Sequence, residues 1–510
     1  MAGQFRGTYV SENALLPHQA STHFRESEWH IVRGFRSEIR DFKDLPERER
    51  NARLMGLFDE IGLKSASHDW QTSTTEGSQN VYSILHAPRG SHNEAIVLVA
   101  PWTNMDGEFN DGGMALLVSL ARYLKKWSIW HKNLIFVVPS NPHSALRAWV
   151  GAYHTSLKYT AGSVEGAVVL DFASTSERFD HVEVYYDGLN GQLPNLDLIN
   201  TLVKVADAEY VRCDLPGSGP SYHLYGQRLQ TMAAGIFRQI VAGIKPGAGC
   251  EMFSGWRIDA ITLRAVGSDG ETGHDITTFG RLVESVVRSI NNLLEHFHQS
   301  FFFYLLLGPR FFVSIGTYLP CAMLVSNSFL IMAIHIFASK RRSFSRETIG
   351  LTSMTLGAVG LASLMLSSFF VNAISSTTWR LGLFAAATSG CISARKLLGN
   401  DTKQAIYGTA LTLYGFSLTT LSMFNFSLAF GLGFITIPLA WLRRVKFARS
   451  LIILLTCPVT VLGIAAWVMD IPLLDLIDSL IYAHKVLSVW TWQVITQIWL
   501  PMWFVGVIIY

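Results

Sequence analysis

The sequence predicts a mixed α/β domain followed by an all-α transmembrane bundle of about seven helices. Hydropathy divides the chain near residue 311, with a water-soluble composition before it and a mostly apolar one after it. In the first part, short β-branched runs alternate with amphipathic helical patterns, which is typical of a sheet with crossover helices. In the second part, seven apolar stretches approach the length of about 20 residues that crosses a bilayer. We therefore expect two domains, residues 1–300 and 301–510.

The elements of the first domain follow from these patterns in chain order. The predicted strands are Asn80–His86, Glu94–Ala100, Asn133–Val138, Gly166–Asp171, His181–Tyr186 and Ile258–Ala265. The predicted helices are Pro46–Ile61, Gly112–Lys126, Pro142–Leu157, Asn195–Ala206, Arg228–Ile244 and Ile276–Phe297. Since the last of these helices ends close to the apolar region, we expect it to couple the two domains stiffly.

The apolar half is divided by short polar loops. The seven predicted spans are 312–338, 348–372, 380–398, 404–423, 426–442, 450–469 and 490–510. Prolines inside three of them, Pro438, Pro458 and Pro501, predict kinks that could open a groove for lipid, because proline cannot donate to the helical ladder. Between the last two spans, Asp470–Ile481 has the pattern of an amphipathic helix on the membrane surface.

Basic residues gather in alternate loops of this half. The first, third and fifth loops hold eleven of them, and the other three loops hold only Arg380 and Lys485. The eleven residues are Lys340, Arg341, Arg342, Arg346, Arg395, Lys396, Lys403, Arg443, Arg444, Lys446 and Arg449. Cytosolic loops are enriched in Lys and Arg, so the basic loops are predicted to be cytosolic and the N-terminal domain to lie on the opposite side. In a eukaryote that side is the lumen of the secretory pathway.

A lumenal domain needs a segment that starts its translocation, yet residues 1–30 contain no apolar stretch. Either the orientation is the reverse, or a transmembrane helix precedes this sequence in the native protein. We expect the second.

Composition excludes several classes of function. The net charge is +3 and the basic residues concentrate at membrane edges, so nothing indicates nucleic-acid binding. The sequence has no GxSxG, HExxH, P-loop or CxxC motif. Cys213 and Cys250, the two cysteines of the first domain, could form one disulfide or remain two buried thiols.

Polar residues follow the strands at their carboxyl ends, where sites of α/β proteins lie. The order of strand, acidic Gly-rich loop, helix and a strand ending in Asp171 resembles the core of zinc aminopeptidases with two metals. That resemblance implies a bridging water activated by the metals. However, its His-x-Asp position is Pro101-Trp102-Thr103 here, and its pair of glutamates is Asn141-Pro142.

Asp111, Asp171 and His274 match three remaining ligand positions of this family. The glutamate that acts as general base is missing, so we expect no catalytic residue and no metal in this chain, with zinc at a degenerate site as the alternative. In the simpler reading, Asp171 ends a strand and His274-Asp275 caps the final helix.

Three segments carry a more specific resemblance, which spans the whole chain. They are Tyr9–Ala14, Gly188–Leu198 and the stretch from His298 through Tyr304 and Arg310 to Gly316. Together they resemble the GPI-anchor attachment subunit of GPI transamidase, a complex of the endoplasmic-reticulum membrane. That family normally has a transmembrane helix before the Tyr-x-Ser-Glu-Asn segment, in agreement with the helix expected upstream.

The resemblance implies a subunit that does not cut the peptide. A cysteine-protease-like partner would carry the nucleophile, and this chain would hold the GPI glycolipid and position its amine among the other subunits. His298, Gln299, Tyr304 and Arg310, at the expected lumenal membrane surface, and Pro501 are the candidate GPI-binding residues. The alternative is an interfacial aromatic belt with a snorkelling arginine.

The Gly188–Leu198 segment has no evident chemistry. Asn190-Gly191 predicts a tight turn, and a loop exposing Leu193 and Pro194 is a candidate contact for another subunit, against a purely structural turn.

Two other functions remain open. One is a membrane-anchored, metal-dependent aminopeptidase or amide-forming enzyme that uses Asp111, Asp171 and His274. The other is a transporter with a lumenal sensor domain. The near absence of central ionisable residues in the spans, His335 excepted, and the lack of a repeat between halves disfavour a transporter.

Overall fold

The computed structural model describes residues 6–16, 22–72, 75–172, 176–218, 224–267, 273–339, 344–372, 377–445 and 447–510. Four of the predicted loop cations, Lys340, Arg341, Arg342 and Lys446, lie outside these residues. The chain forms two compact units, Met1–Ile315 and Gly316–Tyr510.

The N-terminal unit is a mixed α/β domain, as predicted. Its strands are β1 (Arg6–Gly7), β2 (Lys64–Thr72), β3 (Thr75–Leu85), β4 (Glu94–Val99), β5 (Asn133–Val138), β6 (Ser163–Asp171), β7 (Arg178–Phe179), β8 (His181–Tyr185), β9 (Cys213–Asp214), β10 (Asp259–Val266), β11 (His274–Asp275), β12 (Tyr304–Gly308) and β13 (Phe311–Ser314). Its α-helices are α1 (Trp29–Asp41), α2 (Glu47–Ile61), α3 (Asp111–Lys125), α4 (Ser144–Thr155), α5 (Leu196–Ala208), α6 (Tyr225–Val241) and α7 (Ile276–Asn291). Short 3-10 turns include η1 (Asn13–Leu15), η4 (Leu189–Gly191) and η5 (Cys250–Trp256).

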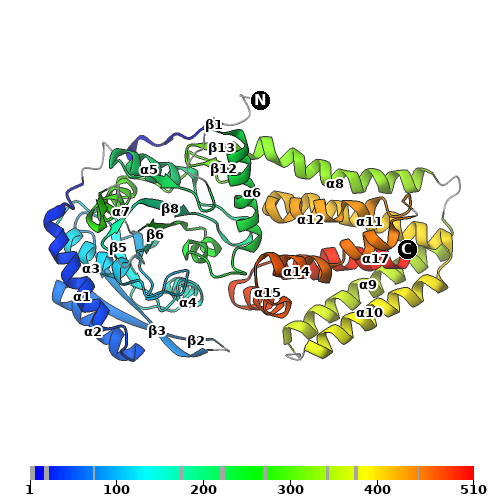
Figure 1. Cartoon of the computed structure of the whole chain (residues 1–510), viewed down its shortest axis with the longest axis horizontal. Coiled ribbons are helices and arrows are strands. Elements are labelled where there is room, and N and C mark those ends of the chain that lie inside the picture. Colours follow the sequence, from blue (N-terminus) through cyan, green and yellow to red (C-terminus); the bar gives the residue numbers. More distant parts are fainter. Residues whose placement is uncertain are drawn as a thin grey trace. The chain divides into compact units, whose positions relative to one another are not determined.

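Eight strands form the central sheet in the order β2-β3-β5-β4-β6-β10-β8-β9. Figure 1 labels β2, β3, β5, β6 and β8 of this sheet. The four inner strands, β5, β4, β6 and β10, run parallel to one another. The pairs β2–β3, β3–β5 and β10–β8 are antiparallel, and β9 is parallel to β8. Strands buried on both faces need continuous apolar sequence, and β4 and β5 are accordingly buried along almost their whole length. The carboxyl ends of the parallel strands therefore meet at one edge of the sheet.

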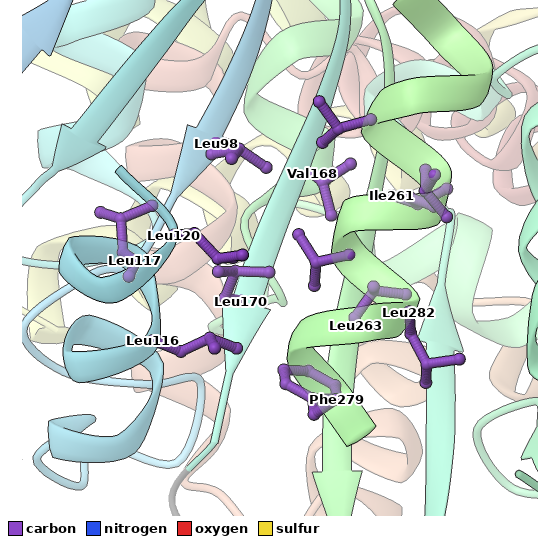
Figure 2. Packing of buried hydrophobic residues seen from close by; sticks show 14 of the residues in the cluster. Leu98, Leu116, Leu117, Leu120, Val168, Leu170, Ile261, Leu263, Phe279 and Leu282 are labelled. Atoms are coloured by element: carbon purple, nitrogen blue, oxygen red, sulfur yellow. The ribbon is translucent and has the colours of Figure 1, made fainter. Parts of the chain in front are cut away.

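Helices cover both faces of this sheet. Figure 2 shows Leu116 and Leu120 of α3, and Phe279 and Leu282 of α7, packing against Leu98, Val168, Leu170, Ile261 and Leu263 of the inner strands. These side chains are fully buried. On the other face, α4 packs against β3 and η5. The leucines of α3 thus lie in the core between this helix and the sheet.

The structure corrects the predicted junction of the halves. Helix α7 ends at Asn291, where the side-chain Oδ1 accepts hydrogen bonds from the backbone N–H groups of His131 (2.9 Å) and Lys132 (3.1 Å). No continuous helix leads to the apolar half, so the expected stiff coupling through this helix is wrong. The chain instead forms the hairpin β12–β13, which joins β1 in a small sheet and contacts α6. The first apolar helix consequently begins at Ile315 rather than residue 312.

The C-terminal unit is helical. Its elements are α8 (Ile315–Ala338), α9 (Arg346–Asn372), α10 (Thr377–Leu397), α11 (Asn400–Phe424), α12 (Phe426–Ala440), α13 (Arg449–Leu455), α14 (Pro458–Val468), α15 (Leu473–Leu487), α16 (Thr491–Val494), η6 (Ile495–Trp499) and α17 (Leu500–Ile509). Within the described residues, three helices are long and apolar enough to cross a membrane, α8, α9 and the segment Thr491–Ile509, with the bent pair α13–α14 as a possible fourth. Helices α10, α11 and α12 occupy the other predicted spans, and their membrane crossing remains a prediction.

One of the three predicted proline kinks coincides with a break between helices, and a second lies beside a π turn of a continuous helix. Helices α13 and α14 are bent by 53° at Pro458, which begins the second helix. Pro501 follows the π-helical turn η6 at the start of α17. Pro438 lies near the end of α12, which finishes two residues later. The amphipathic pattern predicted after the sixth span corresponds to α15.

Candidate functional site

The first candidate site is the carboxyl edge of the sheet, where Asp111 begins α3. Both oxygens of its carboxylate are engaged by Arg36, whose Nε and Nη2 each lie 3.1 Å from an oxygen. Arg40 forms a second ion pair with the same carboxylate. Arg36 is 1% exposed, and its Nη1 also donates to the carbonyl of Ser176 at 2.8 Å. Asp111 is thus neutralised by two arginines of α1.

Asp171, at the end of β6, is also buried beside a cation. Arg264 Nε lies 3.8 Å from its carboxylate, and Asn104 Nδ2 lies 3.5 Å away. Burial raises the pKa of Asp171 to about 6, against the opposing effect of Arg264. His274 lies in the short strand β11, and its ring stacks on Phe179 at 5.7 Å. Asp275 caps α7 by accepting from the N–H groups of Thr277 and Thr278, as the simpler reading predicts.

The other ligand positions of the zinc aminopeptidases hold structural residues. Trp102 is fully buried, and its Nε1 donates to Asn51 Oδ1 at 3.0 Å. Asn141 caps α4, with its Oδ1 accepting from the N–H groups of His143 (3.0 Å) and Ala145 (3.2 Å). Across the described residues, no three His, Cys, Asp or Glu side chains are grouped to hold a metal. Two arginines, an indole and a helix-capping amide do not fit a divalent cation, so the described residues of this edge do not fit a metal centre.

A second feature is the meeting of the three signature segments around the start of α5. The N–H of Ser11 donates to both oxygens of Asp197, at 3.0 and 3.2 Å. Asn200 Nδ2 donates to the carbonyl of Tyr9 at 2.7 Å. The N–H of Leu196 donates to the carbonyl of Phe301 at 2.9 Å. We call this the signature junction: residues 9–14, 188–200 and 298–304, joined by these hydrogen bonds.

Tyr304, a candidate lipid ligand, belongs to the core of this junction. It is 0% exposed, and its hydroxyl donates to the carbonyl of Pro194 at 2.9 Å. Direct contact with a lipid head group would require the ring to leave the core, so the structure gives Tyr304 a structural part instead. Tyr304 begins β12, and its contact with a lipid head group stays a prediction.

The other candidates at this end are accessible. His298 and Gln299 are exposed, and the N–H of His298 donates to the buried Glu12 at 3.3 Å. Arg310 pairs with Asp207 at 2.5 Å while its side chain remains 66% exposed. Phosphate could therefore reach three of the four residues.

The predicted turn at Asn190-Gly191 is present, with both residues at positive φ (59° and 76°). Leu193 is partly buried against the core and Pro194 is buried. The loop therefore exposes Gln192 more than the two residues expected to contact a subunit.

One group of buried polar side chains lies on the opposite face of the sheet. Glu251 in η5 is 4% exposed, and its Oε1 lies 3.6 Å from His143 Nδ1. Burial raises the pKa of Glu251 to about 7, partly opposed by the N–H of Gly249 at 2.9 Å. Burial likewise lowers the pKa of His143 to about 4. Cys250 and Cys213 are both buried free thiols.

The C-terminal unit contains a cavity of about 570 Å³ between the end of α9, α15 and the last helix. We call it the polar cavity, because six of its lining residues have polar side chains. These are Ser367, Ser368, Asn372, His484, Gln493 and Gln497. His484 Nδ1 is buried without a hydrogen-bond partner in the part of the chain that the structure describes. The turn η6 contributes Gln497, and π turns recur at functional sites.

Sequence reasoning missed Arg36 and most of these cavity residues. Arg36 lies on the buried face of α1 with Val32 and Ile39, and a charge at that position interrupts the apolar spacing by which the helix could have been found. The cavity residues come from three segments far apart in the sequence. The sequence shows that these residues are polar, but it does not show that they lie close to one another in the fold.

Comparison with known proteins identifies relatives along most of the chain. The family model described as "Gaa1-like, GPI transamidase component" matches residues 77–507. The GPI transamidase component GAA1 of Saccharomyces cerevisiae is 43% identical over 460 residues, which cover 88% of this chain and 73% of that protein. The GPI transamidase component gaa1 of Schizosaccharomyces pombe is 28% identical, over 88% of this chain and 79% of that protein.

Solved structures are similar in fold at low sequence identity. LapA aminopeptidase of Legionella pneumophila has a TM-score of 0.35 and 15% identity, covering 54% of this chain and 78% of its own. Glutaminyl cyclase of Fimbriiglobus ruber has a TM-score of 0.34 and 10% identity, covering 53% and 98%. Likeness at this level says nothing about chemistry.

Proposed function

This chain belongs to the Gaa1-like family of GPI transamidase components, and on that premise we propose that it is the subunit that recruits the GPI lipid and positions it for attachment to precursor proteins. The observation that carries the proposal is the polar cavity, an open hollow in which exposed and half-buried hydrogen-bonding side chains lie among apolar ones. A glycolipid offers both the hydrocarbon and the polyol groups that such a lining can bind.

The position of the cavity agrees with this role. Its residues lie at the C-terminal end of α9, in the second half of α15 and at the start of the last helix. The loops at these ends are the ones poor in Lys and Arg, so the positive-inside rule predicts a lumenal position for this end. GPI would then enter with its head group toward the lumen of the endoplasmic reticulum, the side on which the sequence predicts the N-terminal unit.

We assign no bond-making residue to this chain. The sheet edge that resembles an aminopeptidase site holds Asp111 between two arginines and lacks a general base, which counts against the metal-dependent enzyme. The nucleophile would come from a cysteine-protease-like partner subunit, and this chain would contribute by orienting the lipid amine.

Two surfaces supplement the cavity in this proposal. His298, Gln299 and Arg310 offer donors to the phosphates or sugars of GPI, and Pro501 shapes the last helix beside η6. The turn around Asn190, with Leu193 and Pro194 behind it, is the proposed contact for another subunit. Leu193→Arg should then weaken co-purification of the complex, and unchanged assembly would exclude this contact.

A tryptophan placed in the polar cavity tests the lipid role. In membranes where the variant replaces the native chain in the assembled complex, Ser368→Trp should lower both the GPI that co-purifies and the anchoring of a reporter by at least about tenfold. The matched control is Ser353→Trp, an exposed serine of the same helix that does not line the cavity.

Release of the reporter to hydrazine separates positioning from peptide cleavage. Hydrazine is a small amine that needs no lipid site, so the Ser368→Trp complex should still transfer the reporter to it. Loss of the hydrazine product together with GPI attachment, or retention of GPI at the native level, would contradict the proposal.

A further inference from the structure

A second chamber in the C-terminal unit, the apolar cavity, has a volume of about 190 Å³. Side chains of α9, α10, α14, α15 and the last helix line it, among them Phe384, Leu462 and Ile477. It adjoins the polar cavity through Ser367, which lines both. Trp492 Nε1 and Thr496 Oγ1 lie 3.0 and 3.2 Å from Ser367 Oγ, and these contacts tie α9 to the last helix between the two chambers.

Arg380 is the one charged residue among the described residues that line this chamber. It is 8% exposed, its Nη1 donates to Asp478 Oδ1, and its guanidinium lies 5.9 Å from the centre of the Phe370 ring. A guanidinium removed from water needs an anion close by, because an unpaired buried charge is costly. The side chain of Asp478, in contrast, is 59% exposed. This carboxylate can therefore return to water at little cost when another anion takes its place.

The combination selects one class of ligand. A hydrocarbon chamber with one cation fits an amphiphile that has an acyl chain and an anionic group next to it. The guanidinium presents a planar fork of donors that matches a phosphodiester with two parallel hydrogen bonds. A neutral lipid would leave Arg380 with Asp478, and a soluble anion would leave the apolar walls empty.

We propose that the apolar cavity takes an acyl chain of an inositol phospholipid and that Arg380 binds its phosphodiester, with Asp478 holding the guanidinium until the lipid arrives. This inference rests on the proposed function for the identity of the lipid as the phosphatidylinositol part of GPI. Free phosphatidylinositol has the same phosphodiester and acyl chains, so the test separates the two sources.

The test uses the full chain in detergent with phosphatidylinositol that carries a diazirine on one acyl chain, and with phosphatidylcholine carrying the same chain. In the native protein, we expect light-induced labelling by phosphatidylinositol at residues lining the apolar cavity, read by mass spectrometry. Arg380→Gln should reduce that labelling about tenfold, since hydrogen bonds to a charged group are lost. Arg380→Lys should retain most of it, and Asp478→Asn should increase it by removing the competing carboxylate.

The matched control is Lys396→Gln, an exposed cation near the other end of α10 that does not line the chamber. Labelling of the native protein outside the chamber would overturn the proposal whether or not the variants fold. An equal loss of phosphatidylcholine labelling in Arg380→Gln would overturn the assignment of the ligand as an inositol phospholipid, because phosphatidylcholine carries the same phosphodiester.

Unlabelled GPI added as a competitor distinguishes this inference from the proposed function. If GPI reduces the labelling at a lower concentration than unlabelled phosphatidylinositol does, the result supports both the proposed function and this inference. If phosphatidylinositol labels the chamber but GPI does not compete, the phosphate site stands and the lipid role in anchor attachment loses its support. If GPI co-purifies with the complex but no inositol phospholipid labels the chamber, the proposed function stands and this inference fails.

Discussion

Replacing Arg36 with alanine should destabilise the N-terminal unit by about 2–4 kcal/mol. The substitution removes two hydrogen bonds to the Asp111 carboxylate and one to the Ser176 carbonyl. Hydrogen bonds to charged groups contribute about 1.5–3 kcal/mol, and breaking a buried ion pair costs about 3–5 kcal/mol. Because Arg40 still pairs with Asp111 in the variant, the expected loss lies near the lower end of the range for a broken buried ion pair.

Pulse proteolysis of the full chain in detergent, over a series of urea concentrations, measures this loss. Its partner variant is Asp111→Asn, which removes the charge that Arg36 neutralises. In that background, Arg36→Ala should cost at least about 1 kcal/mol less, which a double-mutant cycle detects. A loss below about 1 kcal/mol for Arg36→Ala alone would refute the view that α1 is held by this ion pair.

The same cycle bears on the metal question. The double variant Arg36→Ala/Arg40→Ala frees the carboxylate of Asp111 from both cations. If that carboxylate belonged to a latent metal site, zinc would stabilise the double variant by mass action. We expect no shift of the urea midpoint with zinc, since Trp102 and Asn141 occupy the positions of the missing ligands with structural contacts.

Three further predictions concern the N-terminal unit. Glu251→Gln should stabilise this unit at pH 8 by about 2–3 kcal/mol more than at pH 5. The reason is that a carboxyl whose pKa in the folded state is raised to about 7 contributes stability at low pH, and this stability is lost as the pH rises through 7. Urea unfolding curves of the native protein and the variant at both pH values measure the effect, and an equal effect at the two pH values would show that the group is ionised throughout. Tyr304→Phe should cost about 1–2 kcal/mol in the same assay, because the buried carbonyl of Pro194 loses its donor, and an unchanged midpoint would contradict that. Asp197→Ala should speed limited proteolysis around Ser11 by freeing its N–H group, with Asp197→Asn intermediate, and equal cleavage rates in all three proteins would show that the signature junction does not hold this segment.

Local patterns predicted much of the N-terminal unit. The leucines of α3 and the β-branched run of β4 identify their elements because each pattern repeats with the period of the backbone it folds on. The same reasoning missed α1, where buried Arg36 interrupts the apolar face, and it extended α7 past Asn291. In both cases a polar side chain makes its hydrogen bonds to a distant segment, and no window along the sequence contains that partner.

The candidate functional residues also divide into those that the sequence predicted and those that only the structure revealed. The three signature segments were recognisable as specific sequence, and the structure brings them together at the start of α5. Their individual roles were not predictable: the hydroxyl of Tyr304 is committed to Pro194, whereas His298 remains exposed. The prolines of the spans predicted a groove for lipid, and Pro458 does line the apolar cavity, but the other residues that line the two cavities were not predicted.

By itself, the sequence determined the division into a mixed α/β unit and an apolar helical half, the positions of most elements and the family. These depend on hydropathy, on periodicity over a few turns and on specific motifs, all of which are properties of neighbouring residues. Only the tertiary structure decided that Arg36 neutralises Asp111, and that Ser367, His484 and Arg380 surround two chambers. Such contacts are set by the path of the whole chain, because the residues that meet are separated by tens to hundreds of positions.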